Sequence, residues 1–361
     1  MKIGIIGAGQ LGRMLALAGY PLGLRFVFLD QSPDAPGAQV GQIVQGAFDD
    51  PARLVQLAEQ VDVITFDVEN VPVDAVRAIA ERKPFYPPVQ ALGASQDRLH
   101  EKSLFRSLKI PTAPFAAVDS LSDLVHAADR IGIPGVLKTR RLGYDGRGQF
   151  YIRSPGDIDP AWQTLGNVPL IYEGFIDFTR EVSLIGVRST TGATEFYPLS
   201  ANTHRAGILR YSCAPFRSAS LQSQARTYMK RVLKQLDYAG VLTIEFFVQR
   251  GRLIANEMAP RVHNSGHWTI EGARTSQFEN HIRAILGLPL GSTEAIGHSA
   301  MVNFIGNIPN LETALKIPGV HYHSYGKEPR PNRKLGHCTI NVPAAGARDK
   351  ALRQLLKLCE R

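Results

Sequence analysis

The chain has 361 residues, of which 44% are hydrophobic and 20% charged, and its formal net charge is +9 at pH 7. This length allows two or three domains, and the composition is that of an ordinary globular protein. No apolar run reaches the length of a membrane span, and an apolar strand begins at the N-terminus, so we expect no membrane partner and no signal peptide. Three scattered cysteines predict neither disulfides nor a metal cluster and favour a reducing, cytoplasmic location. The positive charge favours anionic ligands such as phosphates, but the chain has no Lys/Arg-rich block, and we expect no nucleic-acid partner.

The first segment, KIGIIGAGQLGRML over residues 2–15, is an apolar run followed by glycines spaced G-x-G-x-x-G. Asp30 ends the next apolar run, and the whole pattern is a dinucleotide-binding fingerprint that leaves an NAD(P)-dependent oxidoreductase open. Asp30 leads into QSPDAPG, however, and is better interpreted as a strand-end turn residue. With a helix over 49–60 and a strand over 61–67, the segment predicts half of a parallel, doubly wound sheet.

After residue 95 the pattern changes from alternating strands and helices to hairpins. A charged helix ends near Leu108, and prolines at 111 and 114 mark a connection. Most strands from there to residue 260 are predicted to be antiparallel; they cover 169–175, 180–188, 195–202, 240–249 and 252–259. Helices are expected over 276–287 and 348–358. The fold class is therefore mixed α/β and α+β, with expected domains at 1–95, 96–290 and 291–361.

Two glutamates give the strongest chemical signal. A hairpin centred on Gly251 places Glu245 directly opposite Glu257, and like charges facing each other destabilise a sheet. A divalent cation between them removes the conflict, and an oxygen-only site of few ligands favours Mg²⁺ shared with a substrate phosphate. The alternative is an edge hairpin with both carboxylates in water.

The segment KTRRLGYDGRGQ, residues 138–149, places Lys138 at a strand end before a glycine-rich loop. Backbone N–H groups of such a loop approach anions closely, so the loop and Lys138 are predicted to bind a triphosphate. A flexible hairpin tip is the alternative.

Further polar residues are ambiguous by themselves. Glu173 and Glu181 flank a connection and are candidates to accept hydrogen bonds from a ribose or an amine. A basic loop holds Lys327, Arg330, Arg333 and Lys334 and suits a phosphate monoester. Taken alone, the two glutamates are better interpreted as solvent-exposed side chains, and a solvated loop is at least as good an interpretation of the basic residues.

Taken in order, five motifs resemble the N5-carboxyaminoimidazole ribonucleotide synthetase family of the ATP-grasp superfamily over nearly the whole chain. They are GQLGRM (9–14), FDVENVP (66–72), KTRRLGYDGRGQ (138–149), EMAPRVHNSGHWT (257–269) and RKLGH (333–337). The resemblance implies an ATP-grasp fold with an N-terminal Rossmann-like domain and a small C-terminal domain. It also implies a homodimer that converts 5-aminoimidazole ribonucleotide, bicarbonate and MgATP to the N5-carbamate, ADP and phosphate. Rivals are another ATP-grasp ligase, such as a glycinamide ribonucleotide enzyme or a biotin carboxylase, and the oxidoreductase.

The resemblance also implies roles for individual residues. Expected ATP contacts are Arg98, Lys138, Gly143, Tyr144, Asp145, Gly146, Arg147, Gly148, Gln149, Glu173, Gly174, Phe175, Ile176, Glu181, His204, Asn256 and Glu257. Expected ribonucleotide contacts are Gln10, Leu11, Asp67, Glu69, Asn264, Ser265, Lys327, Arg333 and Lys334. Glu245 and Glu257 would bind Mg²⁺; Arg261 and Lys327 would hold bicarbonate; Tyr144, Asp145 and His263 are candidates for the remaining chemistry. The family usually has Glu where this chain has Asp67, and Glu69, expected on the same strand face, is the alternative contact.

Overall fold

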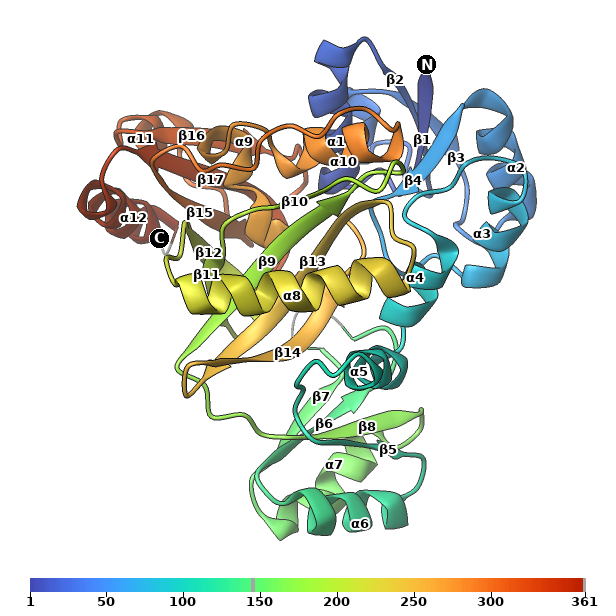
Figure 1. The fold of residues 1–361 in the computed structure, drawn as a ribbon, viewed down its shortest axis with the longest axis vertical. Coiled ribbons are helices and arrows are strands. Elements are labelled where there is room, and N and C mark those ends of the chain that lie inside the picture. The colour runs from blue at the N-terminus through green and yellow to red at the C-terminus, as the bar shows by residue number, and fades with distance from the viewer. Residues whose placement is uncertain (144–146, 360–361) are drawn as a thin grey trace.

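The computed structural model describes residues 1–143 and 147–359. Three sheets organise these residues, and Figure 1 shows the N-terminal sheet and a small sheet on different sides of a large central one. No helix in the described ranges is both long and apolar enough to cross a membrane.

The N-terminal sheet is parallel, with strand order β3-β2-β1-β4, as the alternating pattern predicts. Its strands are β1 (Lys2–Ile6), β2 (Arg25–Asp30), β3 (Gln42–Gln45) and β4 (Val63–Phe66), and its helices are α1 (Gln10–Gly19), α2 (Pro51–Gln60), α3 (Val73–Ala80) and α4 (Val89–Ser95). Asp50 caps α2 by accepting the N–H groups of Ala52 and Arg53, as Asp before Pro predicts. The sequence pattern missed β3, a four-residue edge strand.

A small antiparallel sheet, with order β5-β8-β6-β7, follows helix α5 (Arg98–Ser107). Its strands are β5 (Phe115–Val118), β6 (Gly135–Thr139), β7 (Gln149–Ile152) and β8 (Leu170–Gly174), and it carries α6 (Leu121–Ile131) and α7 (Ile158–Leu165). Figure 1 shows it as a separate layer below α5. It has its own apolar core, built from side chains such as Val118, Leu137 and Tyr172.

The large sheet follows the order β14-β13-β9-β11-β12-β15-β17-β16, with β10 paired to β9. Its strands are β9 (Arg180–Arg188), β10 (Thr194–Phe196), β11 (Ser200–Arg205), β12 (Ile208–Ala214), β13 (Gly240–Gln249), β14 (Arg252–Ala259), β15 (His298–Ile305), β16 (Val320–Ser324) and β17 (Lys334–Val342). Its helices are α8 (Ala219–Gln235), α9 (Thr269–Gly272), α10 (Gln277–Ile285), α11 (Leu311–Leu315) and α12 (Ala345–Cys359).

Two expectations about this region need correction. The segment 195–202, expected as one strand, is divided between β10 and β11, and α8 and β12 were not predicted. The strands after residue 297 also extend the large sheet, because β15 pairs with β12. The expected domain limits at 95/96 and 290/291 stay predictions.

The β13–β14 hairpin pairs Glu245 with Glu257, as predicted, but for a different reason. The turn residues are Arg250 and Gly251, both with positive φ, so the turn centre lies between them rather than on Gly251. This register would place Glu245 opposite Asn256. A bulge at Asn256 shifts the pairing by one residue and brings the two glutamates face to face.

Candidate active site

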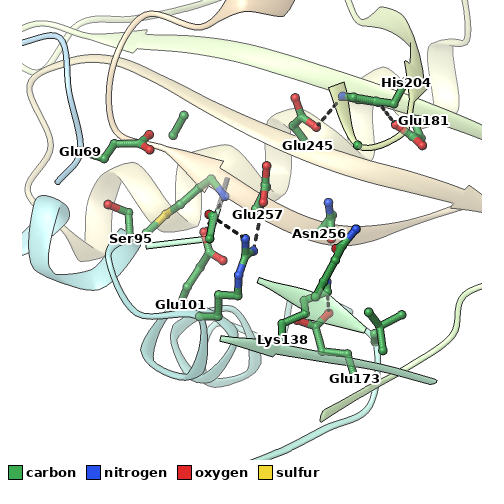
Figure 2. Close-up of a pocket in the computed structure, with 18 of the residues that line it drawn as sticks. Glu69, Ser95, Glu101, Lys138, Glu173, Glu181, His204, Glu245, Asn256 and Glu257 are labelled. Carbon is green, nitrogen blue, oxygen red and sulfur yellow. Dashed lines mark hydrogen bonds and ion pairs between the residues drawn. The ribbon is translucent and has the colours of Figure 1, made fainter. Parts of the chain in front are cut away.

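A cavity of about 540 Å³ lies where the three sheets meet, and Figure 2 shows part of its polar wall. Twenty of the predicted site residues line it: Gln10, Leu11, Glu69, Arg98, Lys138, Gly143, Gln149, Glu173, Gly174, Phe175, Ile176, Glu181, His204, Glu245, Asn256, Glu257, Arg261, His263, Asn264 and Lys334. These residues come from segments up to 324 positions apart, from Gln10 to Lys334. The fold therefore brings the predicted nucleotide and ribonucleotide contacts into one cavity.

The paired glutamates have different electrostatic surroundings. Burial, together with the negative charges of Glu257 and Glu181, raises the pKa of Glu245 to about 7, although His204 opposes the shift. Burial also disfavours ionised Glu257, but Arg98, whose Nη1 lies 3.2 Å from Glu257 Oε2, holds the pKa of that carboxyl below its usual value. Two facing carboxylates, one with a raised pKa, fit a divalent cation, whose charge would offset their mutual repulsion.

Glu181 and His204 form a hydrogen-bonded pair at the end of the cavity near Glu245 (Figure 2). His204 Nε2 lies 4.0 Å from Glu245 Oε2, so the imidazole lies between two carboxylates. Burial disfavours the charged ring, but the bond to Glu181 and the charge of Glu245 raise the pKa of His204 above its ordinary value. Glu181 is therefore engaged by a neighbouring side chain rather than free on the surface.

Lys138 points into the cavity from the end of β6, as predicted, but its partner was not predicted. Its Nζ lies 3.1 Å from Glu173 Oε2, and the buried Lys102 of α5 lies 3.1 Å from the same oxygen. Burial alone would raise the pKa of Glu173, but the two lysines lower it to about 2. Glu173 is therefore an ionised carboxylate fixed by two cations.

The glycine turn before α1 is held by two carboxylates. Asp30 accepts the Ala8 N–H at 2.8 Å and the Ser32 N–H at 3.0 Å, which confirms its interpretation as a turn residue. Asp67 accepts the Gly12 N–H at 2.9 Å and is almost completely buried. Burial raises the pKa of Asp67 to about 6.

Asp67 and Glu69, the two alternative ribonucleotide contacts, lie in different surroundings. Strand β4 ends at Phe66, so the expectation that both carboxylates share a strand face is wrong. Asp67 is enclosed beneath the glycine turn and does not line the cavity, whereas Glu69 lines it and lies 3.2 Å from Arg261 Nη2. Glu69 is therefore the more accessible of the two from the cavity, and the ribonucleotide contact itself stays a prediction.

Of the four described basic residues in the loop, Lys334 alone lines the cavity. Lys327 donates a hydrogen bond to the Gln10 side chain at the start of α1. Burial and the nearby Arg333 lower the pKa of Lys327 to about 8. Arg333 does not line the cavity and donates to the Glu328 carbonyl, and its expected ligand contact stays a prediction.

The segment after β14 presents Arg261, His263 and Asn264 to the cavity. Asn264 lines it and exchanges hydrogen bonds with Asn303, and His263 Nε2 lies 3.5 Å from Glu245 Oε1. The prediction that Ser265 contacts the ribonucleotide needs correction, because its hydroxyl is fully buried between Ser183 and His263 and does not reach the cavity.

Five further predicted residues are placed as follows. Tyr144, Asp145 and Gly146 lie outside the described residues. Arg147 and Gly148 are described but do not line the cavity.

Two charged residues of α5, Glu101 and Lys102, were not predicted from the sequence. Glu101 accepts the Met258 N–H at 2.6 Å, and burial followed by the charge of Glu257 raises its pKa to about 8. Lys102 is one of the most enclosed charged side chains, with 1% of it exposed. Their positions three and four residues after Arg98 are the only sequence feature that could have predicted them, because this spacing places all three residues on one helix face.

Comparisons with known proteins agree with this geometry. Family models match residues 1–96 as a ribonucleotide synthetase preATP-grasp domain, 103–278 as an ATP-grasp domain and 299–350 as a phosphoribosylaminoimidazole carboxylase C-terminal domain. The N5-carboxyaminoimidazole ribonucleotide synthase of Pseudomonas aeruginosa is 54% identical over 94% of each chain. The chain belongs to the N5-carboxyaminoimidazole ribonucleotide synthase family.

Solved structures of this family share the fold. The synthetase of Thermus thermophilus has a TM-score of 0.95 at 53% identity and covers 99% of this chain and 98% of its own. The synthase of Aspergillus clavatus, solved with ADP and 5-aminoimidazole ribonucleotide, has a TM-score of 0.93 at 31% identity and covers 100% and 98%. The predicted ATP-grasp fold and family are thus confirmed, and the oxidoreductase interpretation is not supported.

Proposed function

We propose that this protein uses ATP and bicarbonate to carboxylate 5-aminoimidazole ribonucleotide on its exocyclic N5 amine, with release of ADP and phosphate, as a step of purine biosynthesis. The observation that carries this proposal is the single cavity that joins Lys138, Glu245 and Glu257 with Gln10 and Lys334. One end offers cations and carboxylates suited to a metal-bound triphosphate. The other end combines a helix N-terminus with a lysine, which suits a phosphate monoester.

Glu245 and Glu257 would hold Mg²⁺, and the ion would neutralise charge on the phosphate oxygens of ATP. Lys138 would contact the same phosphates from the small sheet, and Arg98 would keep Glu257 ionised and oriented. Catalysis of this kind consists mainly of positioning and charge stabilisation.

A bicarbonate oxygen would attack the γ-phosphorus of ATP, and the bond to ADP would break, giving carboxyphosphate. The N5 amine would then attack the carboxyl carbon and the C–O bond to phosphate would break, or that bond would break first to give phosphate and CO₂, which the amine would attack. In both routes phosphate leaves, an N–C bond forms and the amine loses a proton. Arg261, which is paired with Glu69, would hold the anionic bicarbonate, and Lys327, bonded to Gln10, would act on the same region. Tyr144, Asp145 and His263 stay candidates for the proton transfers.

The deciding experiment measures ADP release with bicarbonate, in the presence and absence of 5-aminoimidazole ribonucleotide. We expect ADP release to require both and N5-carboxyaminoimidazole ribonucleotide to accumulate. Formate with the same ribonucleotide, and glycine with phosphoribosylamine, serve as the control reactions. A preference for either control would replace this proposal with another ATP-grasp ligase.

The metal assignment has its own test. Glu257→Gln removes the charge but keeps the shape, so we expect ATP turnover to fall by about 100-fold or more. Binding of Mn²⁺ as a spectroscopic probe, measured with ADP present, should weaken in parallel. Exposed Glu312 pairs with Lys316 on the distant helix α11, and Glu312→Gln should change neither quantity. Undiminished Mn²⁺ binding in Glu257→Gln would contradict the assignment.

We also propose a cytoplasmic homodimer: the family resemblance supports the dimer, and cysteines that form no disulfide among the described residues support a reducing compartment. Light scattering coupled to size-exclusion chromatography, at the concentrations used for activity, tests the dimer. A monomer that is fully active would overturn it.

A further inference from the structure

Lys102 lies on the face of α5 that is turned toward the small sheet, and only 1% of its side chain is exposed. It does not line the cavity, so the proposed chemistry gives it no role. A buried ammonium group is costly unless it is paired and hydrogen-bonded. The Lys102 ammonium group forms an ion pair with Glu173, and its Nζ lies 3.1 Å from Glu173 Oε2.

The same carboxylate oxygen is also the partner of Lys138, at 3.1 Å. Lys138 is 14% exposed and faces the cavity, as Figure 2 shows, whereas Glu173 is 4% exposed. Two ammonium groups therefore share one carboxylate, and the three residues together carry one net positive charge. Arg98, the other cation near Glu173, is itself paired with Glu257.

This arrangement has a direct electrostatic consequence. Without Lys102, Glu173 and Lys138 would form a closed, neutral ion pair at the wall of the cavity. With Lys102 present, Glu173 is neutralised from the buried side, and the charge of Lys138 remains available to an anion in the cavity. Burial and the charge of Lys102 lower the pKa of Lys138, against the pull of Glu173, which agrees with a cation that is only partly compensated.

We propose that Lys102 is a positioning residue for ATP, which neutralises Glu173 so that Lys138 presents an uncompensated charge to the triphosphate. This inference rests on the proposed function, because it takes the cavity anion to be the phosphate chain of ATP. Lys102 itself touches no substrate and acts through the shared carboxylate.

The test compares a phosphate-bearing ligand with its nucleoside. Lys102→Met should weaken binding of the MgATP analogue AMP-PNP by about tenfold and that of adenosine by less than about twofold. Lys102→Arg, which keeps the charge, should retain most of the affinity for AMP-PNP. Lys234→Met, which removes an exposed lysine of α8 far from the cavity, should change neither affinity.

A double variant separates charge from structure. Removal of the carboxylate as well, in Lys102→Met/Glu173→Gln, should free Lys138 again and restore the ratio of AMP-PNP to adenosine affinity. The single variant Glu173→Gln leaves two cations and should shift that ratio in favour of AMP-PNP, which keeps the test available if Lys102→Met does not fold. Equal weakening of both ligands by Lys102→Met, or an unchanged ratio in Glu173→Gln, would overturn the inference.

Failure of this inference is distinguishable from failure of the proposed function. If the wild-type protein binds AMP-PNP but does not carboxylate 5-aminoimidazole ribonucleotide, the proposed function is wrong. If the wild-type protein is active but the affinity ratios do not respond to Lys102 and Glu173, only the role of Lys102 is wrong.

Discussion

His281 of α10 lies where the N-terminal sheet meets the large sheet. Its Nδ1 accepts the Val241 N–H at 3.1 Å, so its Nε2 carries the proton and donates to the Thr65 hydroxyl at 2.9 Å. Complete burial lowers the pKa of His281 to about 3. Protonation of Nδ1 would remove the acceptor of the Val241 N–H in β13 and would place a charge between two apolar layers.

The pH dependence of stability follows from that pKa. An unfolded histidine takes up a proton below about pH 6.5, whereas the folded one does so only near pH 3, so the unfolded state binds more protons between these values. The stabilisation by neutral His281 is thus complete above pH 6.5 and is lost as the pH falls from 6.5 toward 3. The unfolding temperature of His281→Gln should lie below that of the wild-type protein at pH 7.5, and the difference should be smaller at pH 5.

Val125→Gln, at an exposed non-ionisable position of α6, is the control, and its effect on the unfolding temperature should be the same at both pH values. A deficit in His281→Gln that does not change between pH 7.5 and 5 would contradict the assigned tautomer and burial.

At the scale of elements, the strand–turn–helix unit β1–α1 is specified by its glycines and by Asp67. Gly7 has φ +93°, and a Cβ there would lie 1.8 Å from Asp67 Oδ1. Asp67 fixes the first turn of α1 through the Gly12 N–H, and Gln10 at the same helix end faces the cavity. The geometry of the turn is therefore coupled to the predicted ribonucleotide contact.

We expect Gly7→Ala to destabilise the fold by about 2 kcal/mol, from backbone strain and the clash with Asp67. The KM for 5-aminoimidazole ribonucleotide should rise more than the KM for ATP, because α1 would move. Adding Asp67→Ala removes the clash but not the strain, so the unfolding temperature should recover only in part. Full recovery of the unfolding temperature would contradict the backbone strain at Gly7. An equal rise in both KM values would contradict the coupling between the turn and the ribonucleotide contact.

Several elements were predictable because local patterns determine them. The cap at Asp50 and the β1–α1 turn follow from short segments of sequence, whereas the pairing of Glu245 with Glu257 was predicted from a turn centre that the structure does not have. The bulge at Asn256 was not predictable, because the register of a hairpin is a property of both strands and of the turn. Lys102 was missed for a similar reason, since charged helix residues normally face solvent and its partner Glu173 is 71 residues away.

At the scale of the whole molecule, the small sheet is joined to the rest mainly by polar contacts. Asp97, the cap of α5, receives two hydrogen bonds from Arg140, at 3.0 and 2.7 Å, and Lys102 reaches Glu173. The apolar core of the small sheet is distinct, whereas the N-terminal sheet shares a core with α10 and with Tyr325. The small sheet is therefore the part that opens most easily.

We expect backbone amides of β5, β6 and β8 to exchange hydrogen faster than those of β1, β9 and β13, because opening of the small sheet exposes little shared apolar surface. AMP-PNP should slow exchange in the small sheet selectively. Hydrogen exchange followed by mass spectrometry checks both statements. Equal protection of all three sheets without nucleotide would contradict this division.

The strand order of the large sheet also constrains how the chain folds during its synthesis. The small sheet is completed by a contiguous segment that ends at Gly174, and the strands of the N-terminal sheet all lie before residue 67. Strand β17, however, lies between β15 and β16 and ends at Val342, so the large sheet is completed only when nearly the whole chain has left the ribosome. The edge of β12 is unpaired until β15 is made, and the edge of β15 is then unpaired until β17 is made, so the nascent chain depends on its C-terminal strands to cover edges that are open to aggregation.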